Sequence, residues 1–317
     1  MKTVRIIKNW DFPDLFRQTP EGKGIWKNTY FTEEKIHKCD YAVVLNFTTK
    51  PIRIKCPQNH LWCIHQEPPN EYFGVRQLFT NTIYAKVFTP NLNLTDSRYI
   101  HSHGAIAWHI GKSYDEMKKN STPLKNRILS CIISNKTNFS GHRQRLKFLT
   151  TLTGKMDFDL FGYGFKPVKN KWDALAHYRY SLIFENYSGP DYWSEKLADC
   201  FLSGTMPIYY GCTNLTKYFP KESFVSIDLN NPNAISIIKK TINSNLWIRN
   251  KKAIEYARDL ILDKYQIFPF LTNYINKSEK ESIRKRVTEW INIPNEDNTF
   301  NKIRHSIYRL SHIKLHI

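Results

Sequence analysis

The sequence is poor in cysteine and contains no long apolar segment. Its 317 residues include 6 cysteines, too few and too widely spaced for the disulfide framework of a small secreted domain. No apolar run approaches the roughly 20 residues of a membrane-spanning helix, and the N-terminus lacks the features of a secretory signal. We therefore expect a cytoplasmic protein with reduced, buried thiols, and not a polytopic membrane protein or an anchored secretory enzyme.

Acidic residues are scarce relative to basic ones. The chain has 47 lysines and arginines against 28 aspartates and glutamates, a formal net charge of +19. This balance favours anionic partners such as nucleotide phosphates, acidic lipid or nucleic acid. The excess is spread along the chain and does not form a compact basic arm. A basic nucleic-acid-binding protein is nevertheless an alternative function, and strongly salt-dependent binding would be its signature.

The pattern of apolar residues predicts an α/β protein with two domains. Apolar residues make up 41% of the chain, and short apolar runs alternate with amphipathic segments. Strands are expected at residues 3–8, 41–46, 61–65, 84–88, 127–133, 157–161, 180–184, 206–210 and 224–227. Helices are expected from Gly141 to near Gly154 and at residues 171–179, 194–202 and 233–243, with a mostly helical chain after Leu246.

The domain boundaries follow from this alternation. Residues 1–150 are expected to form an N-terminal α/β domain and residues 151–300 a C-terminal one. Residues 301–317 repeat apolar side chains at helical spacing between basic residues, which predicts a basic amphipathic helix. Two interpretations of this helix remain open: it packs on the body of the protein, or it makes peripheral contact with an anionic membrane surface.

Two polar clusters follow buried strands in the first half of the chain. Glu67 lies in His65-Gln66-Glu67-Pro68-Pro69, where a strand enters a rigid turn; it is either a general base at a cleft edge or a strand-end carboxylate in solvent. Arg143 and Arg145 lie in the first turn of a helix, where cations oppose the helix dipole. That placement indicates either a bound anion or a solvated basic turn.

A third polar cluster follows the strand at residues 180–184. Glu185-Asn186 and a short loop lead into Trp193-Ser194-Glu195-Lys196 at the start of a helix. A helix N-terminus with an adjacent lysine can hold a diphosphate, and a neighbouring glutamate can bind ribose hydroxyls. Any single Glu-Lys pair is also common on protein surfaces.

The third cluster as a whole resembles the signature of glycosyltransferase family 10, the α1,3/α1,4-fucosyltransferases. The family pattern reads approximately F-E-N-S, a loop, Y-x-T-E-K, a helix, G-x-x-P-[IV]-x-x-G and S-F-[IV]. Ser194 replaces the family's threonine in the second element. The matching segments are Phe184-Glu185-Asn186-Tyr187-Ser188, Tyr192-Trp193-Ser194-Glu195-Lys196, Gly204-Thr205-Met206-Pro207-Ile208-Tyr209-Tyr210-Gly211 and Ser223-Phe224-Val225.

The resemblance extends more weakly into the first half of the chain. Gln66-Glu67-Pro68 is similar to the family's E-S-P segment, with Pro68 in place of the serine. Ser134-Asn135 resembles the family's S-N, which precedes an arginine that binds the donor phosphate. We assign this arginine to Arg145 because it keeps the family's distance to Gly162, with Arg143 as the fallback.

The resemblance implies a GT-B-like fold, with two Rossmann-like domains, a central cleft and a helical C-terminal segment. It also implies inverting transfer of fucose from GDP-fucose to a hydroxyl of a glycan acceptor, in α1,3 or α1,4 linkage. Glu67 would be the general base, and Arg145 and Lys196 would stabilise the departing diphosphate. Tyr192 and Glu195 would bind the nucleoside end of the donor. Asn186 would contact its phosphate or sugar.

Two points stay open under this resemblance. No motif identifies the sugar itself, so a GT-B transferase that uses another nucleotide sugar is an alternative. Asp157-Phe158-Asp159 has the D-x-D pattern that binds a divalent ion in GT-A enzymes, but Arg145 and Lys196 could neutralise the diphosphate without one. We expect no metal site and no required cofactor, although a divalent ion could stimulate the reaction.

A zinc site at Cys56, His60, Cys63 and His65 is also disfavoured, because only Cys63 and His65 share a face of their strand.

Overall fold

The computed structural model describes residues 1–119, 122–281, 287–298 and 300. It divides the chain into two compact units. Unit 1 comprises Met1–Phe12, Ile25–Ser102 and the described residues from Ile275 onward; unit 2 comprises Pro13–Gly24 and His103–Tyr274. The expected amphipathic helix at residues 301–317 lies outside the described residues.

Unit 1 is built on a seven-stranded sheet with the order β2-β3-β1-β4-β6-β7-β8. All neighbouring strands are parallel except β2 and β3. Every residue of the central strands β4 and β6 is buried, as expected for strands covered on both faces. The strands are β1 (Lys2–Ile7), β2 (Ile25–Trp26), β3 (Thr29–Thr32), β4 (Tyr41–Leu45), β6 (Leu61–Ile64), β7 (Lys86–Thr89) and β8 (Tyr99–His101), and helix α1 spans Phe73–Leu78.

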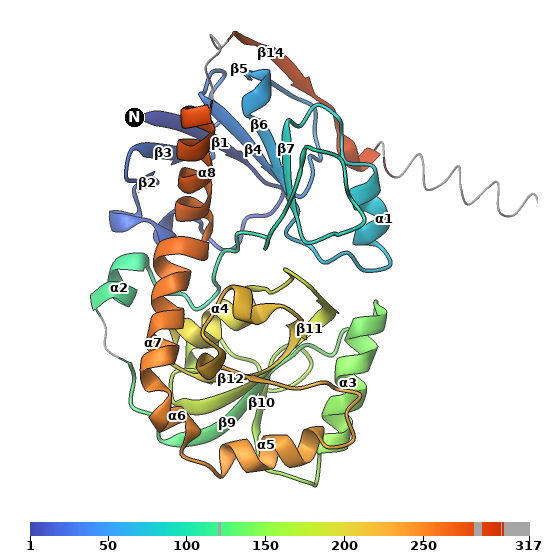
Figure 1. Ribbon diagram of the computed structural model, residues 1–317, viewed down its shortest axis with the longest axis vertical. Helices are drawn as coiled ribbons and strands as arrows, with labels where there is room; N and C mark the ends of the chain where they lie inside the picture. Colours follow the sequence, from blue (N-terminus) through green and yellow to red (C-terminus); the bar gives the residue numbers. More distant parts are fainter. Residues whose placement is uncertain (120–121, 282–286, 299, 301–317) are drawn as a thin grey trace, which may run out of the picture. The chain divides into compact units, whose positions relative to one another are not determined.

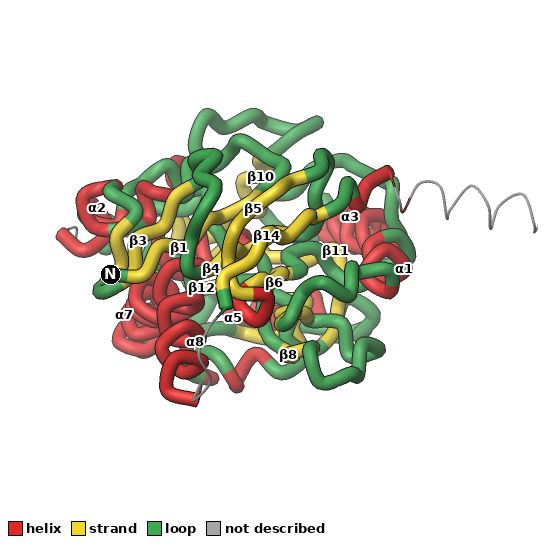
Figure 2. Tube along the Cα trace, turned by 90° about the horizontal axis from the view of Figure 1, so that it is seen from above, coloured by secondary structure: helices red, strands yellow, loops and turns green. Residues whose placement is uncertain are grey.

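A second, smaller sheet in unit 1 joins distant parts of the sequence. Strand β5 (Ile52–Pro57) pairs antiparallel with β14 (Thr288–Ile293), and the two lie side by side in Figure 2. The buried side chains of Ile54 and Ile291 face each other across this ladder and extend the unit 1 core. The chain after Leu246 is therefore not purely helical.

Unit 2 contains a five-stranded parallel sheet with the order β10-β9-β11-β12-β13 (Figure 1). Its strands are β9 (Arg127–Ile132), β10 (Asp159–Phe161), β11 (Tyr178–Gly189), β12 (Met206–Cys212) and β13 (Val225–Ser226). Because β9 pairs with both β10 and β11, it belongs to this sheet and not to an N-terminal domain. The division of the chain thus differs from the predicted boundary between residues 150 and 151.

Helices complete the core of unit 2. Phe148 of α3 packs edge-on against Phe184 of β11, with ring centroids 5.5 Å apart. Leu197 and Phe201 of α4 are fully buried in the same core. The helices are α2 (Tyr114–Lys119), α3 (Ser140–Leu152), α4 (Glu195–Leu202), α5 (Ala234–Ile242), α6 (Leu246–Arg249) and α7 (Lys251–Leu260). A π-helical segment at Ile261–Tyr265 precedes α8 (Ile267–Glu281), which belongs to unit 2 up to Tyr274 and to unit 1 from Ile275.

The structure confirms two α/β units, each built on a largely parallel sheet, and most of the predicted elements. The predicted helix at residues 171–179 is wrong. The Asn170 side chain accepts the Trp172 N–H and starts a single 3-10 turn at Lys171–Ala174. Strand β11 then begins at Tyr178, which pairs with Arg127 of β9. Residues 178 and 179 therefore belong to a buried strand, although their sequence pattern predicts a helix.

The six cysteines all lie within the described ranges, and all are buried free thiols, as predicted. Among the described residues, the helices are too short or too polar to cross a membrane.

Candidate active site

Four of the five predicted donor residues lie where strand β11 leads into helix α4 (Figure 1), and the fifth, Arg145, lies on α3. The pairing of β11 with β12 is regular up to Phe184 and shifts register before Gly189. The residues after Phe184 therefore leave the regular ladder at the carboxyl end of a buried strand, where ligands bind in parallel α/β sheets. Ser194 is the N-cap of α4, and its hydroxyl accepts the Lys196 N–H.

Glu185 is the centre of the first group of contacts. Its side chain is fully buried, and its carboxylate accepts both the backbone N–H and the hydroxyl of Ser194 at distances of 2.7–2.8 Å. Lys196 Nζ lies 3.2 Å from Glu185 Oε2. Burial acts to lower the pKa of Lys196, but the carboxylates of Glu185 and Glu195 outweigh it and raise that pKa. The Lys196 ammonium is therefore charged and fixed at the N-terminus of α4.

Lys171 forms a second group of contacts with the same helix. Its Nζ lies 3.2 Å from Glu195 Oε1 and 3.2 Å from Asp199 Oδ2. Asp199 is fully buried, and its Oδ1 accepts the His109 N–H at 2.7 Å. Burial raises the pKa of Asp199 to about 6 although Lys171 acts in the opposite sense. For Glu195, the lysines Lys171 and Lys196 overcome burial and bring its pKa well below the usual range.

Arg145 is a buried cation without a complete set of partners. It lies on α3 with only 3% of its surface exposed, its Nη2 donates to Ser134 Oγ at 2.9 Å, and its Nε has no hydrogen-bond partner. Within the described ranges, no carboxylate forms an ion pair with it. Arg143, the fallback, is exposed and donates to the Thr137 carbonyl at 2.9 Å. The burial pattern favours Arg145 as the anion ligand.

Asn186 and Tyr192 connect α3 to the loop before α4. The Tyr192 hydroxyl donates to Asn186 Oδ1 at 2.9 Å, and Asn186 Nδ2 lies 3.5 Å from His142 Nε2. The backbones of α3 and β11 approach closely here, because a Cβ on Gly141 would lie 1.9 Å from the Asn186 carbonyl oxygen. Only glycine fits this contact without a backbone shift.

The structure thus brings five of the six predicted site residues together in unit 2. Glu195 and Tyr192 both act on the Arg145 guanidinium through space. Lys196 lies 3.6 Å from Glu195 Oε1, and Asn186 accepts the Tyr192 hydroxyl. The sixth residue, Glu67, lies in unit 1.

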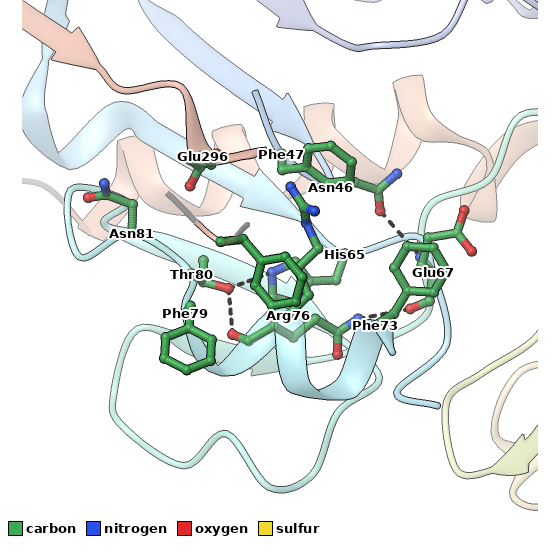
Figure 3. Close-up of a pocket in the computed structure, with 12 residues that line it drawn as sticks. Asn46, Phe47, His65, Glu67, Phe73, Arg76, Phe79, Thr80, Asn81 and Glu296 are labelled. Atoms are coloured by element: carbon green, nitrogen blue, oxygen red, sulfur yellow. Dashed lines mark hydrogen bonds between the residues drawn. The ribbon is translucent and has the colours of Figure 1, made fainter. Parts of the chain in front are cut away.

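Glu67 borders a pocket at the carboxyl end of strand β6. Its backbone is held at both ends: its N–H donates to Asn46 Oδ1 at 3.3 Å, and its carbonyl accepts from Gln77 Nε2 at 3.0 Å. In Figure 3 its carboxylate lies at the rim of the pocket, beside Asn46 and Phe73 and pointing away from Thr80. The carboxylate thus lies on a backbone that is fixed on both sides.

The interior of this pocket is built around a neutral histidine. His65 is buried, and its Nδ1 and Nε2 lie 3.1 Å from the Thr89 hydroxyl and 2.9 Å from the Thr80 hydroxyl. Burial lowers the pKa of His65 to about 3. Phenylalanine rings and polar side chains share the wall, which is lined by Asn46, Phe47, His65, Glu67, Phe73, Arg76, Gln77, Phe79, Thr80, Asn81, Glu296 and Phe300.

The residues considered for metals make other contacts. Asp159 of the D-x-D sequence accepts the Tyr178 hydroxyl at 2.7 Å and pairs with Arg127 at 3.1 Å. His60 Nδ1 lies 2.8 Å from the Asp40 carbonyl oxygen, and its ring stacks on Tyr41. Among the described residues, no group of three or more histidine, cysteine or acidic side chains is arranged to hold a metal ion.

Sequence reasoning assigned no role to Glu185, Lys171 or Asp199. Glu185 lies in the F-E-N segment that resembles the family pattern, so the motif contained it although no role was predicted for it. The spacing of Glu195 and Asp199, four residues apart, places both on one face of a helix. Lys171 gave no such signal, because it reaches them from a segment 24 residues away from Glu195.

Comparison with known proteins is consistent with this arrangement. Residues 122–245 match the family described as glycosyltransferase family 10 (fucosyltransferase) C-term. An alpha-(1,3)-fucosyltransferase FucT of Helicobacter pylori is 43% identical over 60 residues, 19% of this chain and 13% of that protein. The human 4-galactosyl-N-acetylglucosaminide 3-alpha-L-fucosyltransferase 9 is 27% identical over 140 residues, 42% of this chain and 37% of that protein.

Similar solved structures include an α1,3-fucosyltransferase with a TM-score of 0.48 and 19% identity, covering 85% of this chain and 92% of the other. A crystal structure of α1,3-fucosyltransferase with GDP-fucose has a TM-score of 0.46 and 19% identity, covering 84% of this chain and 92% of the other. The chain aligns with well under two thirds of the length of the curated relatives named above. The matched segment contains Arg145 and the whole region from β11 to α4. The segment at residues 122–245 is therefore similar to the C-terminal part of glycosyltransferase family 10.

Proposed function

We propose that the protein is an inverting glycosyltransferase that moves fucose from GDP-fucose to a hydroxyl of a glycan acceptor, in α1,3 or α1,4 linkage. The family description and the names of the relatives support fucose as the transferred sugar. A transferase for another nucleotide sugar would use the same cationic site, so the donor is part of the test below.

The observation that carries this proposal is the buried, incompletely partnered Arg145. Removing an ionised side chain from water is costly unless an opposite charge or hydrogen bonds compensate it. Arg145 has one neutral hydroxyl partner and an unpartnered Nε. A diphosphate would supply the missing charge and acceptors, and arginine is well suited to bind phosphate oxygens.

The other residues of unit 2 have complementary roles in this proposal. The Lys196 ammonium and the N-terminus of α4 attract the diphosphate. Charge that develops on the leaving diphosphate is stabilised by Arg145 and Lys196, which are fixed before the reaction begins. Glu195 and Tyr192 bind the nucleoside end, and Asn186 contacts the phosphate or the sugar. Because two cations already neutralise the diphosphate, we propose that no metal ion is required.

Glu67 acts as general base in the proposed reaction. It removes a proton from the acceptor hydroxyl, which attacks the anomeric carbon on the face opposite GDP and so inverts its configuration. The transition state has oxocarbenium character. The fixed Glu67 backbone and its rim position support this role, since a base must reach a hydroxyl within hydrogen-bond distance.

Binding of the donor is tested by thermal unfolding with and without GDP. At a GDP concentration about 100-fold above Kd, binding should stabilise the wild-type protein by about 2.7 kcal/mol. Lys196→Ala should remove this response, whereas Lys169→Ala, an exposed lysine nearby in sequence, should keep it. An unchanged response in Lys196→Ala would refute the phosphate site. A panel of nucleotide sugars identifies the donor, and protection by UDP-sugars but not GDP-fucose would overturn the fucose assignment.

The general base is tested separately from donor binding. Glu67→Gln should retain the GDP response and lose transfer by about 10²- to 10⁴-fold, the usual contribution of a general base. Glu71→Gln, a second carboxylate in the same turn region, serves as the matched control and should remain active. A fully active Glu67→Gln enzyme would remove Glu67 from this role.

A further inference from the structure

Lys171 occupies a position that the proposed reaction does not itself explain. It lies in the single 3-10 turn at Lys171–Ala174, which the Asn170 side chain caps. From there its Nζ reaches between two carboxylates on successive turns of α4, with 3.2 Å to Glu195 Oε1 and 3.2 Å to Asp199 Oδ2. Its side chain is 23% exposed, and that of Asp199 is 0% exposed.

The two carboxylates that Lys171 joins differ in their exposure. Asp199 is completely enclosed, and its other oxygen accepts the His109 N–H. Glu195 retains 21% exposure of its side chain, and its ion pairs with Lys171 and Lys196 both use Oε1. Among the described residues, no hydrogen bond or ion pair engages Glu195 Oε2. Lys171 thus joins a buried anchor to a carboxylate that keeps one oxygen available.

We propose that Lys171 is a positioning residue, which fixes Glu195 Oε1 against Asp199 so that Oε2 is oriented to accept hydroxyl groups of the donor nucleoside. The inference rests on the proposed function, because it concerns the carboxylate that binds the nucleoside end. Lys171 itself touches no substrate. It acts by reducing the rotameric freedom of Glu195, a freedom that ligand binding would otherwise have to remove.

The charges around Glu195 determine how the loss of Lys171 would change the pKa of Glu195. Lys196 adjoins Glu195, Asp199 lies one turn along α4, and Glu185, Arg145, His109 and Arg17 also act on this group of charges through space. Without Lys171, Glu195 and the enclosed Asp199 would share one face of α4 with only Lys196 as a direct cationic partner. Of the charges that lower the pKa of Glu195, that of Lys171 acts most strongly, so its loss would raise this pKa from its depressed value.

A double-mutant cycle on GDP affinity tests this role, with titration calorimetry at pH 7.5. Lys171→Met and Glu195→Gln should each weaken GDP binding by about 10-fold, the change that follows from about 1.4 kcal/mol. Because both substitutions remove the same interaction, Lys171→Met/Glu195→Gln should be little weaker than either single variant. Lys171→Arg should restore most of the affinity, and Lys169→Met should match the wild type. Losses that simply multiply in the double variant would overturn the proposal.

A pH series separates positioning from a merely structural role. In Lys171→Met the raised pKa of Glu195 should make GDP binding fall more steeply between pH 7.5 and 5.5 than in the wild type. A parallel pH dependence in the two proteins would count against positioning. If wild-type protein does not bind GDP at all, the donor assignment fails, and the same four proteins are compared by urea unfolding. Coupling between Lys171 and Glu195 in the free energy of unfolding would support the proposal that Lys171 fixes Glu195, and additive effects would reject it.

Discussion

At the scale of single residues, the buried cations of the donor region are paired with carboxylates, with one exception. Lys196 and Lys171 each have carboxylate partners at 3.2 Å. Arg145 has none within the described ranges, although it is the most deeply buried of the three cations. A protein that keeps such a side chain is expected to lose stability for the sake of binding. The imbalance therefore predicts opposite effects on stability and on function when Arg145 is replaced.

Arg145→Met tests this expectation. Methionine fills a similar volume without a charge, so the free energy of unfolding of the nucleotide-free protein should stay the same or rise by about 1 kcal/mol. GDP affinity should fall by more than about 10-fold, because a charge-assisted contact is removed. Urea unfolding and calorimetry on the same preparation give both quantities. A strongly destabilised variant with normal GDP affinity would show that Arg145 is structural and not a phosphate ligand.

At the scale of elements, the site depends on how closely helix α3 approaches strand β11. Arg145 and Gly141 lie on the same helix, one turn apart, and Gly141 contacts the Asn186 backbone. The position of α3 therefore sets both the reach of Arg145 and the position of Asn186. A side chain at Gly141 would push the helix and strand apart.

Gly141→Ala should accordingly damage both stability and binding. Its Cβ would lie 1.9 Å from a carbonyl oxygen that belongs to backbone, so the free energy of unfolding should fall by about 3 kcal/mol, the upper range for overpacking. The GDP response should weaken as well. Gly154→Ala is the matched control: it has φ +74° with nothing within 4 Å of the added Cβ, so it should cost about 1 kcal/mol and leave the GDP response intact. Equal effects of the two substitutions on GDP binding would contradict this view of α3.

The elements also show what could be predicted from sequence. Strands such as β4, with the sequence Tyr-Ala-Val-Val-Leu, have β-branched and apolar residues throughout, so their burial was evident. The β5–β14 ladder was missed because it joins residues more than 200 positions apart, and no local pattern records such a pairing. The end of the helix predicted at residues 171–179 is wrong for a similar reason, because Tyr178 pairs with Arg127, far away in the sequence. The same holds for the site. The residues within the sequence motifs were predicted, whereas the contacts of Lys171 with α4 are visible only in the structure.

At the scale of the whole molecule, buried neutral histidines make both units sensitive to acid. Burial lowers the pKa of His65 in unit 1 to about 3. In unit 2 it lowers the pKa of His103 to about 3 and that of His109 to about 4. Unfolded histidine titrates near 6.5. Below that pH the unfolded chain binds protons that the folded units exclude, so stability falls as the pH falls from about 6.5 toward these values.

Asp199 acts in the opposite direction in unit 2. Its folded pKa of about 6 exceeds the value of an unfolded aspartate, so folded protein takes up this proton first and gains stability as the pH falls through 6. In unit 2, Asp199 therefore offsets part of the effect of His103 and His109. His65 is the buried histidine that tests the acid sensitivity of unit 1.

His65→Gln should make the stability of unit 1 less dependent on pH. For a histidine whose pKa drops from about 6.5 to about 3 on folding, the free energy of unfolding should decrease by about 1.5 kcal/mol between pH 6.5 and 5.0. Glutamine can still hydrogen-bond with Thr80 and Thr89 but does not titrate, so its variant should lack this part of the decrease. His37→Gln, at an exposed position of the same unit, should keep the wild-type dependence. Urea unfolding at the two pH values measures the difference, and an identical decrease in His65→Gln and wild type would mean that folding does not lower the pKa of His65.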